Sequence, residues 1–456
     1  MRLTVVHPAI GHRQGQRPDG RDYIKTWQME PLPAAAVAAQ TPPEIEKRFY
    51  DDRVEAIPFD EPTDLVAISV ETYTARRSYE IASEYRSRGV PVVMGGFHAS
   101  LVPEEVSRYA EAVVVGEAES VWAELVDDAR HGKLRPLYRG EERPSLAHVR
   151  YDRTIFARKR YLPLGLVETG RGCRFPCDFC AIQTVFQRSH RHRPIDDVVA
   201  DLTRLRREKN LFFFVDDNFA ADLKHARELV DAIAPVGVRW VTQVSINAAH
   251  DEDFLSRLAR SGCQGVLIGF ESLDPEVLKG MNKRFNMMKG GYDAALANLR
   301  RHGLRVYGTF VFGYDGDTEA SFEAAVEFAL RHRLYLTAFN HLTPFPGTPL
   351  YRRLEAEGRL THEAWWLDRD YSYNLVPFRP SGMTATALQR GCAAARRRFY
   401  GWPSMLRRGF DPVNRANAFM FRTFFLINGM HRAEVRQRDR FPLGDERWPG
   451  QLLQVA

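Results

Sequence analysis

Short apolar runs of strand length alternate with amphipathic runs of helical length through most of this chain, and this alternation restricts its fold more than any other feature. In the first 140 residues, the strand-like runs lie at 3–6, 64–70, 91–94 and 112–115. Stretches with helical spacing lie between them, at 78–88 and 103–110. Parallel strands need crossover connections, which are usually helices. The sequence therefore predicts an α/β protein whose N-terminal part is a Rossmann-like, doubly wound parallel sheet.

A second series of strand-like runs follows, and helical stretches separate its members. The strand-like runs lie at 164–170, 211–215, 239–244, 265–269, 305–312 and 336–342. Six strands with helices between them predict a partial (β/α)6 barrel of the TIM type. We therefore expect a sheet domain over 1–140, a linker over 141–162, a barrel over 163–350 and an α-helical C-terminal region over 351–456 that covers the substrate.

Composition excludes several classes of protein. Hydrophobic residues make up 44% and charged residues 27% of the chain, which is typical of a globular protein. No run approaches the roughly 18 apolar residues of a transmembrane helix, and the N-terminus has no signal sequence. The net charge of +6 is spread over Arg-rich helices, so nucleic-acid binding is not expected. The apolar run 418–427 is expected to pack internally; its exposure would indicate a lipid-like substrate or a membrane surface.

Three of the five cysteines form a C-x3-C-x2-C motif directly after a predicted strand: Cys173, Cys177 and Cys180. An odd number of cysteines, so unevenly spread, is a poor disulfide framework, and we expect a reduced, cytoplasmic protein. Three thiolates on one loop can bind three irons of a 4Fe–4S cluster and leave the fourth iron open. The alternative is a structural zinc site, which needs four ligands, with His190 or His192 as the fourth.

Two predicted strand ends in the N-terminal sheet carry residues suited to a ligand site: 70–74 and 94–100. Ligands of open parallel sheets bind at the carboxyl ends of the strands. Gly95 and Gly96 would let the backbone approach a ligand closely. The alternative is that they only form a tight turn between a strand and a helix.

Taken together, these motifs resemble the radical S-adenosylmethionine (SAM) superfamily, in particular its members with a cobalamin-binding-type N-terminal domain. The resemblance runs through 95–100, 116–119, the cysteine loop, 216–218, 269–272 and 342–349. The C-terminal part resembles the helical extension of a subgroup that includes hopanoid C-methylases. The resemblance to the radical SAM superfamily implies that Cys173, Cys177 and Cys180 bind the cluster. It also implies that the open iron of the cluster chelates the amino and carboxylate groups of SAM.

The resemblance also implies which residues bind SAM. Phe179 matches the position that contacts the adenine, with packing of the loop as the alternative. Asp216, Asp217 and Asn218 match the segment that holds the methionyl amino group, with Asp217 as the expected acceptor and helix capping as the alternative for the other two. The remaining candidates share a position on or after later strands: Gln243, Ser245, Asn247 and Glu271. Burial of an unpaired Glu271 would be costly, so it should meet SAM, water or a lysine such as Lys283.

For cobalamin, the implied residues are Thr72, Thr74, Gly95, Gly96 and His98. The Asp-x-His-x-x-Gly motif of domains that ligate cobalt through histidine does not occur in residues 1–140. Some members of the family bind cobalamin without such a histidine, so cobalamin remains the expected third cofactor, beside the cluster and SAM.

The resemblance implies reductive cleavage of SAM and cobalamin-dependent methyl transfer to an unactivated centre of a small molecule or peptide. An electron donor such as flavodoxin or ferredoxin is the expected partner. The alternatives are cobalamin-independent reactions: 3-amino-3-carboxypropyl transfer, cyclisation or oxidation. A zinc-binding adaptor that contacts nucleic acid is a further alternative, outside radical chemistry.

Overall fold

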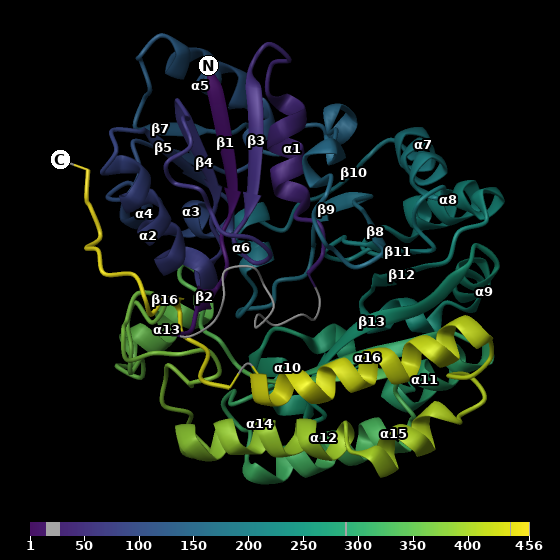
Figure 1. Cartoon of the computed structure of the whole chain (residues 1–456). Coiled ribbons are helices and arrows are strands. Elements are labelled where there is room, and N and C mark those ends of the chain that lie inside the picture. The colour runs from purple at the N-terminus through teal and green to yellow at the C-terminus, as the bar shows by residue number, and fades with distance from the viewer. Residues whose placement is uncertain (15–27, 288–289, 438, 456) are drawn as a thin grey trace.

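The computed structural model describes residues 1–14, 28–287, 290–437 and 439–455. Its N-terminal part is a six-stranded parallel sheet in the order β3-β1-β4-β5-β6-β7 (Figure 1). The strands are β1 (Arg2–His7), β3 (Glu46–Asp51), β4 (Leu65–Ser69), β5 (Val92–Gly95), β6 (Ala112–Val115) and β7 (Leu137–Arg139). The predicted open parallel sheet is therefore confirmed.

Helices cover both faces of this sheet, because successive side chains of a strand point to opposite faces. On β4, Leu65 and Ala67 pack against α1 (Leu32–Gln40) and α5 (Trp122–Arg130). Val66 and Ile68 pack against the opposite layer. That layer consists of α2 (Ala75–Arg86), α3 (Phe97–Leu101) and α4 (Pro103–Val106). A strand that is buried on both faces reads as a continuous apolar run, which is why β4 is visible in the sequence.

Two edge strands of this sheet, β3 and β7, do not stand out in the sequence. β3 has the sequence Glu-Lys-Arg-Phe-Tyr-Asp, and only Phe49 and Asp51 are buried in it. An edge strand faces solvent along one side, so it does not need the apolar run that marks a central strand. Sequence periodicity therefore indicates the centre of the sheet and misses its edges.

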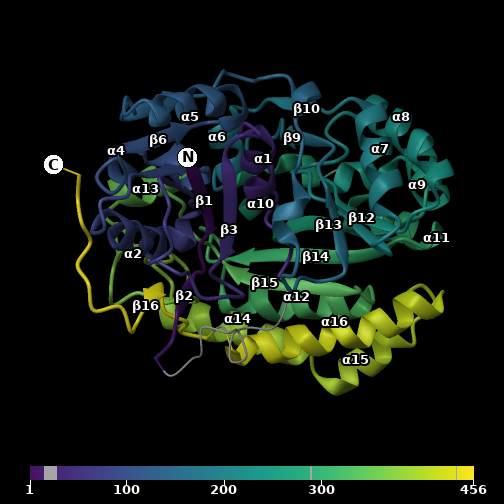
Figure 2. The ribbon, with the colours of Figure 1, turned by 45° about the horizontal axis from the view of Figure 1, so that its top comes forward.

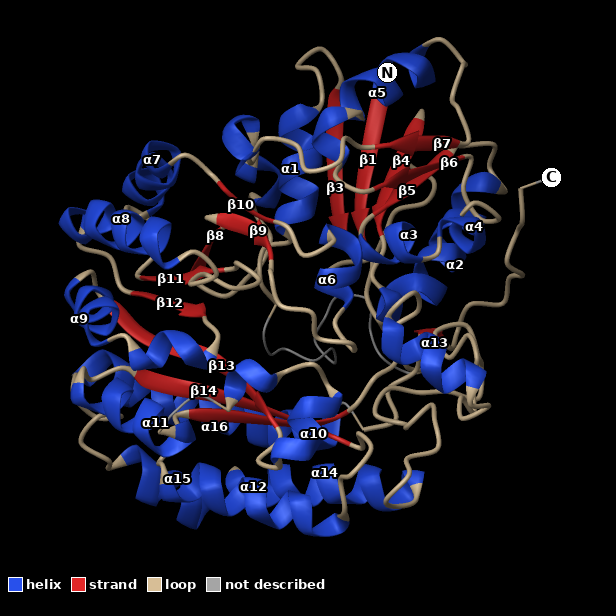
Figure 3. Cartoon of the chain, turned by 180° about the vertical axis from the view of Figure 1, so that it is seen from behind, coloured by secondary structure: helices blue, strands red, loops and turns tan. Residues whose placement is uncertain are grey.

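The second sheet is the predicted barrel. Six parallel strands follow each other in the order β8-β11-β12-β13-β14-β15. They are β8 (Leu164–Val167), β11 (Leu211–Phe214), β12 (Trp240–Gln243), β13 (Cys263–Glu271), β14 (Arg305–Phe312) and β15 (Leu336–His341). The helices that accompany them are α7 (Ile195–Leu205), α8 (Leu223–Ile233), α9 (Glu252–Arg260), α10 (Pro275–Gly280), α11 (Gly291–Arg301) and α12 (Glu319–Arg331). Because β8 and β15 do not pair, this is an open (β/α)6 barrel (Figure 3).

The barrel packs its outer face tightly and leaves its inner face partly open. Phe310 and Phe312 of β14 are buried among the helices. The residues that alternate with them, Thr309 and Val311, are only half-buried. An inner face with this exposure can still accept a ligand.

Residues 141–162 join the two sheets and are packed, although we expected a linker. Tyr151 and Phe156 lie in the core of the N-terminal sheet together with Leu166 of β8. Phe213 and Val215, at the end of β11, pack against the same core. The two sheets therefore share apolar contacts, which fixes their relative position.

The C-terminal region is helical, as predicted, with α13 (Pro349–Ala356), α14 (Ala385–Phe399), α15 (Trp402–Gly409) and α16 (Ala418–Gln437). α14 packs on α12 and β15, and α15 and α16 form the outer layer beyond them (Figure 2). The segment between α13 and α14 contacts the N-terminal domain instead, because Trp365 and Trp366 are buried in its core. No helix of the described residues is long and apolar enough to cross a bilayer.

Candidate active site at the cysteine loop

The three cysteines lie on the loop between β9 (Gly170–Gly172) and α6 (Ala181–Phe186), at the carboxyl end of β8. Cys177 is buried, and Cys173 and Cys180 are half-buried. Burial raises the pKa of the Cys177 thiol to about 12, and it raises the pKa of the other two as well. Thiolates are the form that binds iron, so metal binding at this loop must release protons.

Two neighbouring carboxylates at the end of β11 hold the chain that leads into this loop. Asp216 accepts hydrogen bonds from the Thr169 hydroxyl at 2.6 Å and from the amides of Thr169 and Gly170 at 2.7 and 2.5 Å. Asp217 accepts one from the Gly172 amide at 2.8 Å. Both are largely removed from water, which raises the pKa of Asp216 to about 7 and that of Asp217 to about 6. The residue directly before Cys173 is therefore fastened to the barrel strand.

The third residue of this segment contacts a cluster cysteine. The Asn218 side-chain amide lies 3.8 Å from the Cys173 sulfur and donates to the Ser245 hydroxyl at 2.7 Å. Helix capping does not explain Asp216 or Asn218, because α8 is capped by Asp222, whose carboxylate accepts from the amides of Lys224 and His225. The segment therefore serves the cysteine loop and not the helix that follows.

Gln243, Ser245 and Asn247 are half-buried and alternate with fully buried neighbours, as expected for one face. Only Gln243 lies on a strand, since β12 ends there. Gln243 donates to the backbone oxygen of Asp217 at 2.6 Å. The side-chain oxygen of Asn247 is buried and has no hydrogen-bond partner among the described residues, so it is available to a donor group of a ligand.

Glu271 meets the predicted lysine. The Lys283 ammonium donates to Glu271 at 2.5 Å, and both side chains are buried. The pairing of β13 with β14 shifts register between Gly269 and Glu271, and Glu271 has a φ of +62°. Such a bulge redirects a side chain. The positive charge of the nearby Lys283 opposes the rise in the pKa of Cys177 that burial causes. The ion pair therefore influences the ionisation of a thiol on the cysteine loop.

Two contacts anchor the far side of the loop. The Tyr314 hydroxyl donates to the buried Asp178 at 2.5 Å and lies 2.7 Å from the Gly280 oxygen. Phe179, the predicted adenine contact, is half-buried and packs against the barrel core. The sequence analysis missed Asp178 because its partner, Tyr314, is distant in the sequence, and no pattern near the cysteines indicates the contact.

The histidines proposed for a zinc site form a group of their own. The rings of His190 and His192 are 4.5 Å apart between centroids, and those of His192 and His225 are 3.7 Å apart and stacked. Across the described ranges, no three His, Cys, Asp or Glu side chains converge as the ligands of a single ion must. Cluster cysteines each bind a different iron and need not converge in this way.

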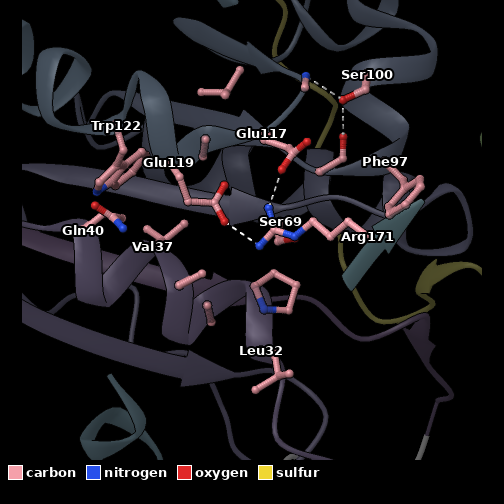
Figure 4. A pocket seen from close by; sticks show the side chains of 18 of the residues that line it. Leu32, Val37, Gln40, Ser69, Phe97, Ser100, Glu117, Glu119, Trp122 and Arg171 are labelled. Atoms are coloured by element: carbon pink, nitrogen blue, oxygen red, sulfur yellow. Dashed lines mark hydrogen bonds and ion pairs between the residues drawn. The ribbon is translucent and has the colours of Figure 1, made fainter. Parts of the chain in front are cut away.

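A cavity of about 350 Å³ lies between the carboxyl ends of the N-terminal strands and the barrel elements β9 and α6, which flank the cysteine loop (Figure 4). Gly95, Gly96, Gly116, Glu117 and Glu119 line it from the N-terminal domain. The barrel contributes Glu168, Gly170, Arg171, Val215 and Asp217. One cavity therefore touches both predicted ligand sites.

The glycines of this cavity have different roles. Gly96 has a φ of +103°, and a Cβ there would lie 2.8 Å from the Val70 oxygen, so it forms the tight turn between β5 and α3. Gly116, with a φ of +83°, has open space where a Cβ would be. Gly95 ends β5 on the cavity wall. Gly95 and Gly116 therefore leave backbone accessible, whereas Gly96 shapes the turn.

Arg171, two residues before Cys173, connects the two domains across this cavity. Its guanidinium lies 2.6 Å from each of three carboxylates, those of Glu117, Glu119 and Glu168. Glu117 also pairs with Arg191. These charges hold the pKa of Glu119 below its ordinary value. The group is visible in Figure 4, where Arg171 lies between Glu117 and Glu119.

The other candidates of the N-terminal domain lie beside the cavity and do not line it. Thr72 and His98 are buried and hydrogen-bonded to each other at 3.2 Å, and His98 also contacts Glu105 at 3.2 Å. Thr74 is bonded to the backbone of Glu71. Glu71 does line the cavity, and it is exposed. Sequence reasoning passed over Glu71 as a ligand-site residue, although it lies in the strand end that drew attention.

Three thiols at the mouth of an open (β/α)6 barrel, with a doubly wound sheet packed over them, define an iron–sulfur enzyme of two α/β domains. The model of the Radical SAM superfamily matches residues 167–329. Bacteriochlorophyllide d C-12(1)-methyltransferase of Chlorobaculum tepidum is 33% identical over 83% of this chain and 84% of its own length. The chain belongs to the radical SAM superfamily, among its methyltransferases. The predicted family, the 4Fe–4S cluster and SAM are thereby confirmed.

Two further proteins support the assignment. Bacteriochlorophyllide d C-8(2)-methyltransferase of the same organism is 30% identical over 71% of this chain and 76% of its own length. The structure of the methyltransferase TsrM from Kitasatospora setae, with cobalamin and a 4Fe–4S cluster bound, has a TM-score of 0.61. The match covers 78% of this chain and 75% of the TsrM chain at 19% identity, so it shows that the two proteins share a fold.

Proposed function

We propose that this enzyme is a cobalamin-dependent radical SAM methyltransferase that acts on an unactivated centre of a small molecule. The observation that carries the proposal is one cavity that is lined both by the N-terminal strand ends and by the elements that flank the cysteine loop, β9 and α6. A methyl carrier in the N-terminal domain and SAM at the cluster would face the same space. Holding two reactants in one enclosed space is a large part of what an enzyme contributes to a reaction.

The barrel residues have distinct roles in this proposal. Cys173, Cys177 and Cys180 would hold the 4Fe–4S cluster, which when bound would supply the electron for reductive cleavage of SAM. Asp217 and Asn218 hold the cysteine loop in place. Asp217 accepts a hydrogen bond from the Gly172 amide, and the side-chain amide of Asn218 contacts the Cys173 sulfur. The predicted contacts for SAM remain Phe179, Gln243, Ser245, Asn247 and Glu271. Asp216 supports the chain that leads into the cysteine loop.

The N-terminal residues fit part of a cobalamin, which supplies a cobalt centre that carries a methyl group. The accessible backbone at Gly95 and Gly116 suits a close ligand, and the apolar wall from α1 suits its nucleotide tail. Thr72, Thr74 and His98 do not line the cavity; hydrogen bonds join Thr72 to His98 and Thr74 to the backbone of Glu71, which does line it. We infer that the protein supplies no histidine to cobalt, because His98 is committed to Thr72 and Glu105.

The acceptor that we propose to test first is a bacteriochlorophyllide. Two relatives that are 33% and 30% identical, over 83% and 71% of this chain, are methyltransferases named for that substrate. The half-buried inner face of β14 and the open side of the barrel leave room for a large acceptor. An electron donor of the flavodoxin or ferredoxin class is part of the same proposal.

The test is anaerobic reconstitution with iron and sulfide, with and without hydroxocobalamin, followed by desalting and reduction in the presence of SAM. We expect a retained corrinoid spectrum, 5′-deoxyadenosine and, with a bacteriochlorophyllide present, a product heavier by one methylene. 5′-Deoxyadenosine without retained corrinoid would contradict the role of cobalamin. Methylthioadenosine instead would indicate transfer of the aminocarboxypropyl group.

A matched pair of variants ties the result to the cavity. Gly116→Leu places a side chain in the open space beside the cavity, and Gly132→Leu does the same at a surface turn with a similar φ of +67°. Both add the same backbone strain, but only Gly116→Leu should lose the corrinoid spectrum while it keeps the absorbance of the cluster. Equal retention by the two variants would contradict the proposed cobalamin site.

A further inference from the structure

The helical hairpin of α15 and α16 exposes large apolar side chains that the proposed reaction does not use. Trp402 and Leu406 of α15 are 55% and 48% exposed, Phe410 directly after α15 is 54% exposed, and Leu426 of α16 is 65% exposed. Figures 1 and 2 show both helices on the outside of the molecule. The remaining large exposed apolar residues of the described chain, Leu137, Met287, Leu453 and Val455, lie on other elements. Contiguous apolar exposure of this kind marks an interaction surface.

The exposed side chains form one continuous ridge. Trp402, Leu406 and Phe410 are spaced four residues apart, which places them on one face of a helix. The Phe410 ring contacts those of Phe421 and Phe425 at centroid distances of 5.7 and 6.4 Å. The ridge therefore passes from α15 onto Phe421 and Phe425 of α16, and Leu426 adds a further exposed apolar side chain on the same helix.

This exposure is not a consequence of loose packing. The side chain of Arg408, on the inner face of α15, is fully buried. It donates to the backbone oxygens of Leu334, Tyr335 and Phe399 and to Asn428 of α16, at 3.0–3.1 Å. The hairpin is thus held rigidly on the barrel with its apolar ridge outward.

The charge around the ridge has one sign. Between residues 400 and 437, the exposed charged side chains are all arginines: Arg407, Arg415, Arg422, Arg432 and Arg436. None of the five forms an ion pair within the described part of the chain. The two acidic residues of this segment are buried, Asp411 against Arg300 and Glu434 beside His431.

A basic hollow adjoins the ridge. Arg397, Arg432 and Arg436 line a hollow of about 320 Å³ between α14 and α16. The Arg432 guanidinium lies over the exposed Trp402 ring, 5.6 Å from its centroid. Aromatic side chains beside arginines, on a hairpin with no exposed acid between residues 400 and 437, are suited to the interface of an anionic bilayer, where apolar side chains enter and cations meet phosphates.

We propose that the α15–α16 hairpin docks the enzyme on the surface of an anionic lipid bilayer. The ridge of Trp402, Leu406, Phe410 and Leu426 enters the headgroup region, and the arginines contact lipid phosphates. A protein partner is less well matched, because the exposed arginines would need acidic partners around the whole ridge.

The experiment is co-sedimentation of the full-length protein with vesicles of phosphatidylcholine alone or mixed with phosphatidylglycerol. We expect roughly tenfold or stronger enrichment on the mixed vesicles at low salt, since each surface cation contributes to the attraction. High salt should reduce it, because salt screens exposed charges. Trp402 fluorescence should shift to the blue on binding, and Trp402→Phe should remove that shift.

Variants separate the ridge from general charge and hydrophobicity. Leu406→Ser/Phe410→Ser and Arg422→Gln/Arg432→Gln/Arg436→Gln should each lose most of the binding. The controls change the same residue types elsewhere: Leu137→Ser, which is 39% exposed, and Arg88→Gln/Arg130→Gln/Arg204→Gln. The controls should bind as the wild type does. Circular dichroism checks that each variant is folded.

Three outcomes would overturn the proposal. The first is no preference for anionic vesicles at low salt. The second is equal loss of binding in the ridge variants and their controls. The third is a dimer in light scattering that the ridge variants dissociate, without vesicle binding, which would assign the surface to a second copy of the chain. Vesicle binding needs neither cluster nor corrinoid, so its result is independent of the proposed reaction.

Discussion

Arg171 and Glu117 form an ion pair between the two domains, with Nη1 of the arginine 2.6 Å from Oε2 of the glutamate. Glu117 follows β6 of the N-terminal sheet, and Arg171 lies two residues before the first cluster cysteine. The pair is largely buried and forms part of the cavity wall. A single side chain therefore joins the end of β6 in the N-terminal sheet to the strand that leads into the cysteine loop.

Arg171→Gln should lower the free energy of unfolding, and it should also weaken the contact between the two domains at the cavity wall. Removing this cation leaves three buried carboxylates less compensated, which we expect to cost about 3–5 kcal/mol. Differential scanning calorimetry would show a lower melting temperature, and corrinoid retention should fall. The control, Arg130→Gln, removes an exposed pair with Glu44 and should change little. A melting temperature equal to that of the wild type in Arg171→Gln would show that the pair is not a domain clamp.

Cys177→Ala should abolish the cluster absorbance and all cleavage of SAM, because only three thiols lie on the loop. Cys392→Ala removes an equally buried thiol in α14 and serves as the matched control. Iron and sulfide content after anaerobic reconstitution, with the visible spectrum, measures the effect. Cleavage of SAM by Cys177→Ala would refute the assignment of the cluster ligands.

Lys283→Met should lower the free energy of unfolding more than the double change Lys283→Met/Glu271→Gln does. The single variant leaves Glu271 buried without its cation, which costs about 3–5 kcal/mol, whereas the double variant removes both charges. A double-mutant cycle on the unfolding midpoint of the apoprotein measures the coupling. Additive effects of the two changes would mean that the pair contributes little to the folded state.

The carboxyl of Asp216 should make a contribution to the stability of the apoprotein that falls as the pH rises from about 4 to about 7. Burial raises the pKa of Asp216 from 3.8 to about 7. Between these values the folded chain holds a proton that the unfolded chain has lost, so the free energy of unfolding decreases with pH. Asp216→Asn should flatten the melting temperature across this window, whereas Asp60→Asn, at a fully exposed loop position, should not. An unchanged slope in Asp216→Asn would mean that the carboxyl is already ionised at pH 4.

Much of this protein is determined by local sequence pattern. The central strands, the helices between them and the cysteine loop each depend on residues close together in the chain, and hydrophobic periodicity or ligand spacing reports such features directly. The carboxylates Asp216 and Asp217 and the pairing of Glu271 with Lys283 could be predicted for the same reason, because a charged residue that ends a buried strand must find a partner. The edge strand β3 could not, because solvent covers one of its sides.

Only the tertiary structure decided how the parts meet. The convergence of Glu117, Glu119 and Glu168 on Arg171 joins residues up to 54 positions apart and depends on how the two sheets pack. The same holds for the outward ridge of α15 and α16, since the position of the buried Arg408 determines which face of the hairpin is left to solvent. Local periodicity states that a helix has an apolar face. Whether that face is covered depends on every other element of the fold, so it is settled only when the chain has packed.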